Sequence, residues 1–226
     1  MQQFKYFPYK FELMDNQLHK ILEGVRDAAF SQNLLSYSIA EVSGTLDIPV
    51  NELKKYFASD NDLVEKVLAF ERESFLDIFE IYDFEGVNAI DILLTVSREI
   101  SSRFKDISPA LTFSLKSTYP KLYQFHIDSR VSFVFGKIKI NIHKGVIQGL
   151  YREDFSVELL ARLYISRLID LHNPDYFPPE EYSFDMVFDA MFDHFIRGIV
   201  NDKGMCYYEK CRKQLKFKTN KAIASY

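Results

Sequence analysis

The chain has 226 residues, of which 47% are apolar and 27% charged, so it can bury a sizeable core and is neither fibrous nor low in complexity. Glycine and proline are scarce, at eight and seven residues, which argues against a turn-rich sandwich or barrel and favours long helices. The net charge of −4 gives no overall attraction for nucleic acid, so a nucleic-acid-binding role requires a local basic surface. No apolar run approaches the roughly 20 residues that cross a bilayer, and residues 1–13 lack the pattern of a signal peptide. The sequence therefore predicts a cytoplasmic protein without a membrane contact.

The first clear helical periodicity runs from Asp15 to about Gln32. Its apolar positions are spaced three and four apart, as one face of a helix requires. They are Leu18, Ile21, Leu22, Val25, Ala28 and Ala29. Asn33 follows and is a residue that favours the left-handed turn at a helix end.

A second, short helix is expected to begin at Ser38. Ser38 and Glu41 have capping-box spacing, in which the hydroxyl accepts a backbone N–H and the carboxylate reaches back to the cap residue. Gly44 and Asp47 weaken the helix after two turns. Pro49 is favourable at a first helical position, which predicts that a third helix starts there.

In the third helix Leu53 and Phe57 lie four residues apart and are expected to face inward. Ser59 and Asp62 form a second capping-box pattern, at the start of a long helix. Two short helices joined by a turn and flanked by longer helices predict a helix-turn-helix.

Further helical segments follow, and a proline-rich connector at 172–179 separates the last two strongly amphipathic ones. Their predicted spans are 88–104, 108–118, 121–149 with one break, 156–171 and 183–201, before a basic final stretch. The predicted fold is all-α. Residues 1–65 form an N-terminal extension and a three-helix helix-turn-helix head, and residues 66–226 form a larger helical domain.

Residues 21–68 resemble the N-terminal domain of the tetracycline-repressor (TetR) family of regulators without a gap. The marks are the Ile-Leu opening of the first helix, Ser38-Ile39 at the second, Ile48-Pro49 before the third, and Leu53-x-x-Tyr56-Phe57 at its close. A looser match is Gly149-Leu-Tyr-Arg152, which looks like the Gly-Leu-Phe-Arg that ends a long helix in many members.

This resemblance implies a ligand-responsive transcriptional regulator, expected to be a repressor, that binds palindromic operator DNA as a homodimer. The candidate DNA-binding residues are Ser38, Pro49, Val50, Asn51, Lys54, Lys55 and Tyr56. Asn51 carries the amide that pairs with an adenine edge, and Val50 is suited to a thymine methyl. Lys54 and Lys55 are expected to contact phosphates, as is Ser38 at the positive end of its helix. Tyr56 matches a family aromatic.

Three departures from the family pattern weaken the expected DNA contact. Lys54 stands where many members have tyrosine, Asp60 where they have a basic residue, and Asp47 where they have the glycine of the turn. Residues 1–68 contain seven basic and ten acidic residues, and phosphate neutralisation dominates affinity for DNA. We therefore expect weak, salt-sensitive binding. The alternative is a helical ligand- or protein-binding module whose degenerate helix-turn-helix no longer binds DNA.

The two strongly amphipathic helices at 156–171 and 183–201 are expected to form a two-fold four-helix dimer interface, although such stripes are also typical of an ordinary core. The candidate interface residues are Leu160, Tyr164, Leu168, Phe188, Phe192 and Phe195. Aromatic residues crowd the middle of the chain and suit either a core or a pocket for a small hydrophobic or aromatic effector. They are Phe104, Phe113, Tyr119, Tyr123, Phe125, Phe133 and Phe135. No single ligand-binding residue is assigned.

The sequence contains no catalytic or cofactor motif. It lacks GxSxG, a P-loop, GxGxxG and HExxH, and Cys206 and Cys211 have neither redox nor zinc-ligand spacing. We therefore predict that the protein is not an enzyme and uses neither a metal nor a cofactor.

Overall fold

The computed structural model describes residues 15–31, 34–103, 109–171, 173, 175–178 and 180–223. These residues form helices joined by short connections, and the extended pairing within them is one isolated antiparallel bridge between Tyr151 and Val200. The predicted all-α fold is confirmed. The expected helix end at Asn33 and the aromatic ring of Phe104 lie outside the described residues.

The helices agree with the predicted spans to within a few residues. In chain order they are α1 (Asn16–Phe30), α2 (Ile39–Leu46), α3 (Val50–Leu53), α4 (Asp60–Ile81), α5 (Ala89–Arg103), α6 (Pro109–Thr118), α7 (Pro120–Ile147), α8 (Val157–Asp170), α9 (Phe184–Ile199) and α10 (Asp202–Ile223). One prediction was wrong, because α7 has no break. Its two glycines, Gly136 and Gly145, each cost only about 1 kcal/mol relative to alanine, which one long helix tolerates.

The chain divides into two compact units. The head unit comprises Met1–Ser74 and Ile107–His126, and the body unit comprises Phe75–Asp106 and Ile127–Tyr226. The sequence pattern predicts a boundary at residue 65, with everything beyond it in the second domain. The contacts instead join α6 and the first turns of α7 to the head unit, and α4 and α7 each supply residues to both units.

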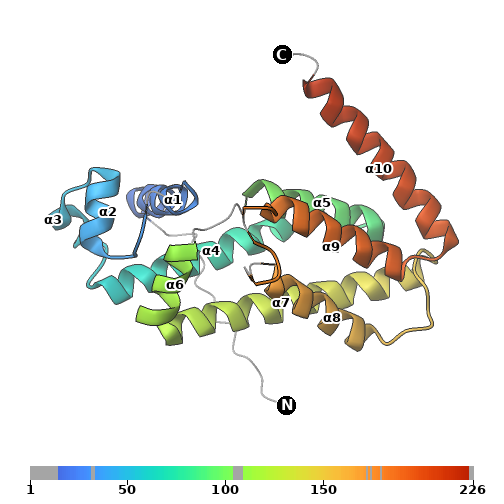
Figure 1. The fold of residues 1–226 in the computed structure, drawn as a ribbon, viewed down its shortest axis with the longest axis horizontal. Helices are drawn as coiled ribbons and strands as arrows, with labels where there is room; N and C mark the ends of the chain where they lie inside the picture. Colours follow the sequence, from blue (N-terminus) through green and yellow to red (C-terminus); the bar gives the residue numbers. More distant parts are fainter. Residues whose placement is uncertain are drawn as a thin grey trace. The chain divides into compact units, whose positions relative to one another are not determined.

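The core of the head unit brings the short helices of the motif onto α1 and α4. Leu53 and Phe57 are both fully buried, as predicted from their spacing. Val42 of α2 and Leu111 of α6 belong to the same apolar cluster. Figure 1 shows α2 and α3 as short helices next to one another, which is the arrangement of a helix-turn-helix.

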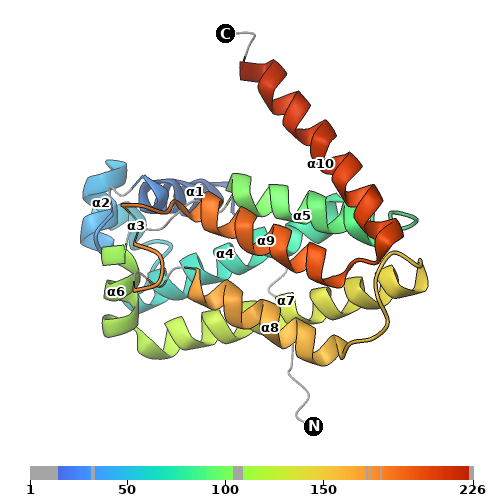
Figure 2. The ribbon, with the colours of Figure 1, turned by 45° about the vertical axis from the view of Figure 1, so that its right-hand side comes forward.

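The body unit packs its helices around a second apolar cluster. α5 and α9 run side by side in both Figure 1 and Figure 2, and α8 contacts α9. Serine hydroxyls cap two of these helices: Ser156 accepts from the N–H of Leu159 and Ser183 from the N–H of Met186. These caps explain why α8 begins at Val157 and α9 at Phe184.

A buried polar chain ties the end of α7 to α5. The Tyr151 hydroxyl donates to Asn141 Oδ1 over 3.0 Å, and Asn141 Nδ2 donates to the carbonyl of Ala89 over 2.9 Å. Burial raises the pKa of the Tyr151 hydroxyl, which keeps it a neutral donor. These hydrogen bonds satisfy the polar groups that the chain places between the helices.

The Gly-Leu-Tyr-Arg segment forms the corner between α7, α9 and α10. Gly149 takes a left-handed conformation at φ 65°, which glycine adopts without steric cost. The N–H of Arg152 then donates to the carbonyl of Ile199, and the N–H of Asn201 donates to the carbonyl of Leu150. The segment that resembles the family motif thus fixes the junction of three helices.

Among the residues with a described structure, no helix has the length and apolarity needed to cross a membrane. The same residues contain no group of three or more histidine, cysteine or acidic side chains arranged to hold a metal ion.

Candidate nucleic-acid interface and effector cavity

The start of α2 is capped by Ser38, but the capping box is only half formed. Ser38 Oγ accepts from the N–H of Glu41 over 3.2 Å, as predicted. The Glu41 carboxylate does not reach back to Ser38. It accepts from the N–H of Leu35 over 2.5 Å and from the hydroxyl of Ser36, and so fixes the loop before the helix.

The turn between α2 and α3 has the geometry that the motif requires. Asp47 ends α2 in the left-handed region, at φ 54° and ψ 41°, where the family pattern has glycine. The Ser43 hydroxyl donates to the carbonyl of Ile48 over 2.6 Å and braces this turn. Pro49 precedes α3 as its N-cap residue, which corrects the prediction that Pro49 is the first helical residue. Its ψ of 138° is extended rather than helical.

The surface of α3 and of the turn directly after it carries the residues predicted to read bases and to bind phosphates. Val50, Asn51, Lys54 and Lys55 are exposed, and Pro49 beside them is exposed too. Tyr56 is half-buried and packs against the head core, so only part of its side chain faces solvent. An ion pair on this surface reduces the positive charge available to phosphates, because Lys55 Nζ lies 2.6 Å from the Glu52 carboxylate.

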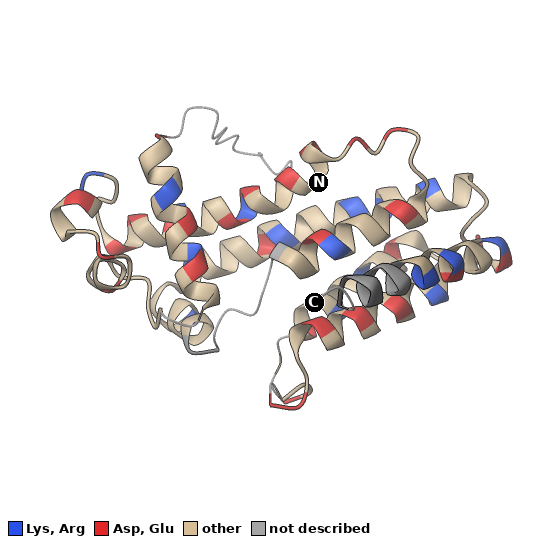
Figure 3. Ribbon diagram, turned by 90° about the horizontal axis from the view of Figure 1, so that it is seen from above, with Lys and Arg blue, Asp and Glu red and all other residues tan. Residues whose placement is uncertain are grey.

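A second lysine near α3 is engaged inside the head unit. Lys66 Nζ donates to the carbonyl of Tyr56 over 2.7 Å and to the Asp62 carboxylate over 2.9 Å. It therefore anchors the turn after α3 to α4. In Figure 3 acidic segments accompany the basic ones on the helices of the head unit.

The side chain of Asp60, the first residue of α4, binds the N-terminus of α2. The sequence did not reveal this contact. Asp60 Oδ1 accepts from the N–H of Ile39 over 2.8 Å, although 21 residues separate the two. The first N–H groups of a helix form the site where a phosphate binds best. In this chain a carboxylate already satisfies one of them, at the helix whose Ser38 was predicted to meet a phosphate.

The six residues predicted for the dimer interface lie toward the body core. Tyr164, Phe188 and Phe192 are buried, and Leu160, Leu168 and Phe195 are half-buried and pack against the same clusters. The structure corrects the prediction at the three buried residues, since a side chain buried inside its own subunit has no surface left for a partner.

A different face of α8 exposes apolar residues to solvent. Leu159, Leu163 and Ile169 are 56%, 52% and 54% exposed. With Arg162 and Ser166, which are also exposed, they occupy one side of the helix at spacings of three and four residues. This set is named the α8 outer face below. It is the apolar surface of α8 that can take part in an association.

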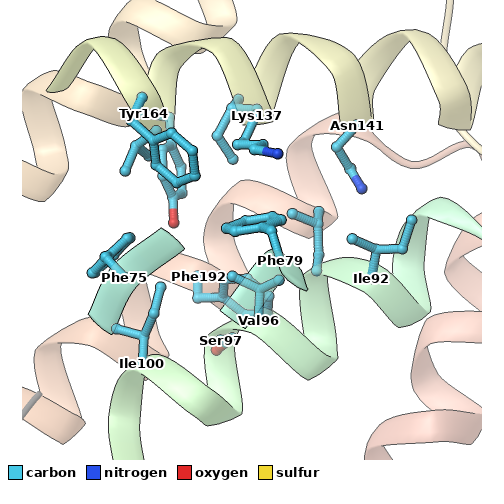
Figure 4. A pocket seen from close by; sticks show the side chains of 14 residues that line it. Phe75, Phe79, Ile92, Val96, Ser97, Ile100, Lys137, Asn141, Tyr164 and Phe192 are labelled. Atoms are coloured by element: carbon cyan, nitrogen blue, oxygen red, sulfur yellow. The ribbon is translucent and has the colours of Figure 1, made fainter. Parts of the chain in front are cut away.

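The body unit contains a cavity of about 50 Å³ between α4, α5, α7, α8 and α9 (Figure 4). Its lining is mostly apolar and aromatic. The lining residues are Phe75, Phe79, Ile92, Leu93, Val96, Ser97, Ile100, Phe133, Val134, Lys137, Ile138, Asn141, Tyr164 and Phe192. Of the aromatic residues that were predicted for a pocket and that the structure describes, only Phe133 lines it.

The other predicted pocket aromatics within the described residues lie elsewhere. Phe113 and Phe125 are largely exposed, at 72% and 59%. Tyr119 and Tyr123 pack against the head core, and Phe135 against the body core. Sequence reasoning missed other cavity aromatics, Phe75 and Phe79 of α4 among them. Their spacing places them on one stripe of that helix, and spacing alone does not separate a core stripe from a cavity wall.

Comparison with known proteins shows the class to which this fold belongs. The sequence matches no protein-family model and no curated protein. A TetR transcription regulator from Haloarcula marismortui is similar over 82% of this chain and 98% of its own, with 13% identity and a TM-score of 0.62. A transcriptional regulator from Saccharomonospora viridis, solved in complex with choline, is similar over 81% and 97%, with 16% identity and a TM-score of 0.60.

The TetR-family regulator PfmR from Thermus thermophilus is similar over 79% of this chain and 97% of its own, with 19% identity and a TM-score of 0.55. The chain thus has the fold of the TetR-family transcriptional regulators, a helix-turn-helix head with a helical body.

Proposed function

We propose that this protein is a ligand-responsive repressor of transcription that binds palindromic operator DNA as a homodimer. The observation that carries the proposal is the helix-turn-helix, with Val50, Asn51 and Lys54 exposed on α3 and the turn directly after it. Leu53 at the end of α3 and Phe57 after the turn are fully buried and anchor this segment. A helix anchored in this way presents a fixed set of side chains, which reading base edges in a major groove requires.

The test is a fluorescence-anisotropy salt titration on the DNA upstream of the protein's own gene, against a scrambled duplex of equal length. We expect specific binding at about 50 mM salt that weakens steeply as salt rises, because few lysines meet phosphates on this acidic head. Equal affinity for the two duplexes at low salt would contradict the repressor proposal.

The Asp60 carboxylate at the N-terminus of α2 favours a second candidate function. This is a ligand- or protein-binding module that has lost DNA affinity. Asp60 satisfies the Ile39 N–H and places a negative charge where a phosphate would come. An Asp60→Asn variant separates the two candidates, because the amide oxygen of asparagine can still accept from Ile39 while the charge is gone.

If the head binds DNA, Asp60→Asn is expected to raise operator affinity roughly threefold or more at low salt, since a charge near a helix terminus and a phosphate is removed. Asp60→Lys is expected to steepen the slope of log affinity against log salt by about 0.9, the value for one added phosphate contact. Anisotropy measures both. Asp27→Asn, an exposed position on α1, is the matched control and should leave both values unchanged. No gain in any Asp60 variant would favour the module without DNA affinity.

We further propose that the dimer forms through the α8 outer face. Palindromic recognition needs two heads related by two-fold symmetry, and an isologous interface places the same face of α8 from each protomer in contact. Leu159 and Leu163 supply exposed apolar surface, and the Arg162 side chain is held along the helix by Glu158 Oε1 at 2.6 Å.

The cavity in the body unit is the proposed effector site. It is mostly apolar, as expected for a small hydrophobic or aromatic effector. At about 50 Å³ it is smaller than the roughly 150 Å³ cavity that accepts a benzene molecule, so an effector must displace the surrounding helices as it enters. A ligand that favours such a displaced arrangement shifts the equilibrium between body geometries and thereby controls DNA binding.

A further inference from the structure

Lys137 places a positive charge at the wall of the apolar cavity. It lies on α7, one turn beyond Phe133, and its side chain is half-buried. Its Nζ is 4.4 Å from the ring centroid of Phe79 and 5.2 Å from that of Phe133. Figure 4 shows the ammonium group next to the Phe79 ring, among the side chains that line the cavity.

No carboxylate in the described part of the chain lies within 4.0 Å of the Lys137 ammonium. The next lysine on the same helix is different, because Lys139 Nζ lies 2.7 Å from the Glu158 carboxylate. Glu158 also accepts from Arg162, and these two hydrogen bonds hold the pKa of its carboxyl below the usual range. Lys139 therefore has an internal counter-ion, whereas the described contacts of Lys137 are with aromatic rings.

The positive charge of Lys137 is destabilised by its surroundings. Burial lowers the pKa of its ammonium group, because the apolar walls solvate a cation less well than water does. An anion that entered the cavity would offset this desolvation and form a charge-assisted hydrogen bond.

Two residues with hydroxyl groups also line the cavity. Ser97 of α5 and Tyr164 of α8 line it, and burial raises the pKa of the Tyr164 hydroxyl, which keeps that group a neutral donor. Asn141 lines the cavity as well, but its amide is already used by Tyr151 and Ala89. The polar groups open to a ligand are thus one cation and two hydroxyls, all able to donate to an anionic oxygen.

From this arrangement we infer that the effector is an amphipathic carboxylic acid, whose apolar body lies among Phe75, Phe79 and Phe192 and whose carboxylate pairs with Lys137. The inference rests on the proposed function for the statement that the ligand is an effector, while binding itself does not depend on DNA.

The test measures ligand affinity by isothermal titration calorimetry on the free full-length protein. The probes are decanoate and 2-naphthoate, each compared with its uncharged primary amide, so that the apolar body stays constant and only the charge changes. We expect each carboxylate to bind at least about tenfold more tightly than its amide, the usual contribution of a hydrogen bond to a charged group. Lys137→Met should abolish this preference for the carboxylate and leave amide affinity unchanged.

Lys139→Met is the matched control, since it removes a lysine from the same helix outside the cavity, and it should keep the wild-type preference. The inference is overturned if neither carboxylate binds, if acid and amide bind equally to the wild type, or if Lys137→Met retains the preference. Because no DNA is present, these outcomes are separate from those of the operator titration. Loss of operator binding would contradict the repressor proposal and leave the calorimetric result standing.

Discussion

A Leu159→Glu, Leu163→Glu double variant is expected to be monomeric and to lose operator binding by about a hundredfold or more. Both leucines lie on the α8 outer face and are more than half exposed, so the charges cost the folded monomer little. In a two-fold interface each substitution appears twice, and like charges would face one another across the symmetry axis. Losing the second head removes the avidity that two linked half-sites provide.

Size-exclusion chromatography with light scattering measures the oligomeric state, and anisotropy on the operator measures the affinity. Ile140→Glu, Ile147→Glu is the matched control, because both isoleucines are exposed on α7, at 65% and 86%. A dimeric α8 variant would contradict the proposed interface, and a monomeric α7 variant would move it to α7.

A Gly204→Ala variant is expected to lower the free energy of unfolding by about 3 kcal/mol, in the upper part of the range for overpacked cores. Gly204 lies in the first turn of α10 and is buried, and a Cβ atom there would overlap the carbonyl oxygen of Leu150. That carbonyl accepts from the N–H of Asn201, and Asn201 Oδ1 accepts from the N–H of Gly204 over 3.0 Å. The methyl group can therefore be accommodated only by separating α10 from the corner that ends α7.

Thermal unfolding followed by circular dichroism should show a decrease in Tm of roughly 10 °C for a chain of this size. Gly136→Ala is the control. It lies inside α7, where an added Cβ atom would meet no neighbouring atom within 4 Å, so alanine should raise stability by about 0.5–1 kcal/mol. Equal Tm values for the two variants would show that the backbone at Leu150 shifts to accommodate the methyl group. The contact between Gly204 and Leu150 would then not hold α10 in place.

The sequence determined the local structure of this protein well. Ser38, Ser156 and Ser183 start helices because a serine hydroxyl satisfies an N–H three residues on, which is a matter of neighbouring residues only. Leu53 and Phe57 are buried because helical spacing puts them on one face. The ungapped resemblance over residues 21–68 extended this local pattern to a fold, which the structural comparisons confirm.

Only the tertiary structure decided which face of each amphipathic helix meets which neighbour. Tyr164 and Phe188 sit on apolar stripes that suit a core and a dimer interface equally, and packing assigns them to the core. Asp60 meets Ile39 across 21 residues, and Lys137 meets Phe79 from another helix, so no local pattern contains either contact. Periodicity fixes the angle of a side chain around its own helix axis, whereas its partner depends on how the helices pack. The contacts on which the proposals about DNA affinity and ligand charge rest are of this second kind.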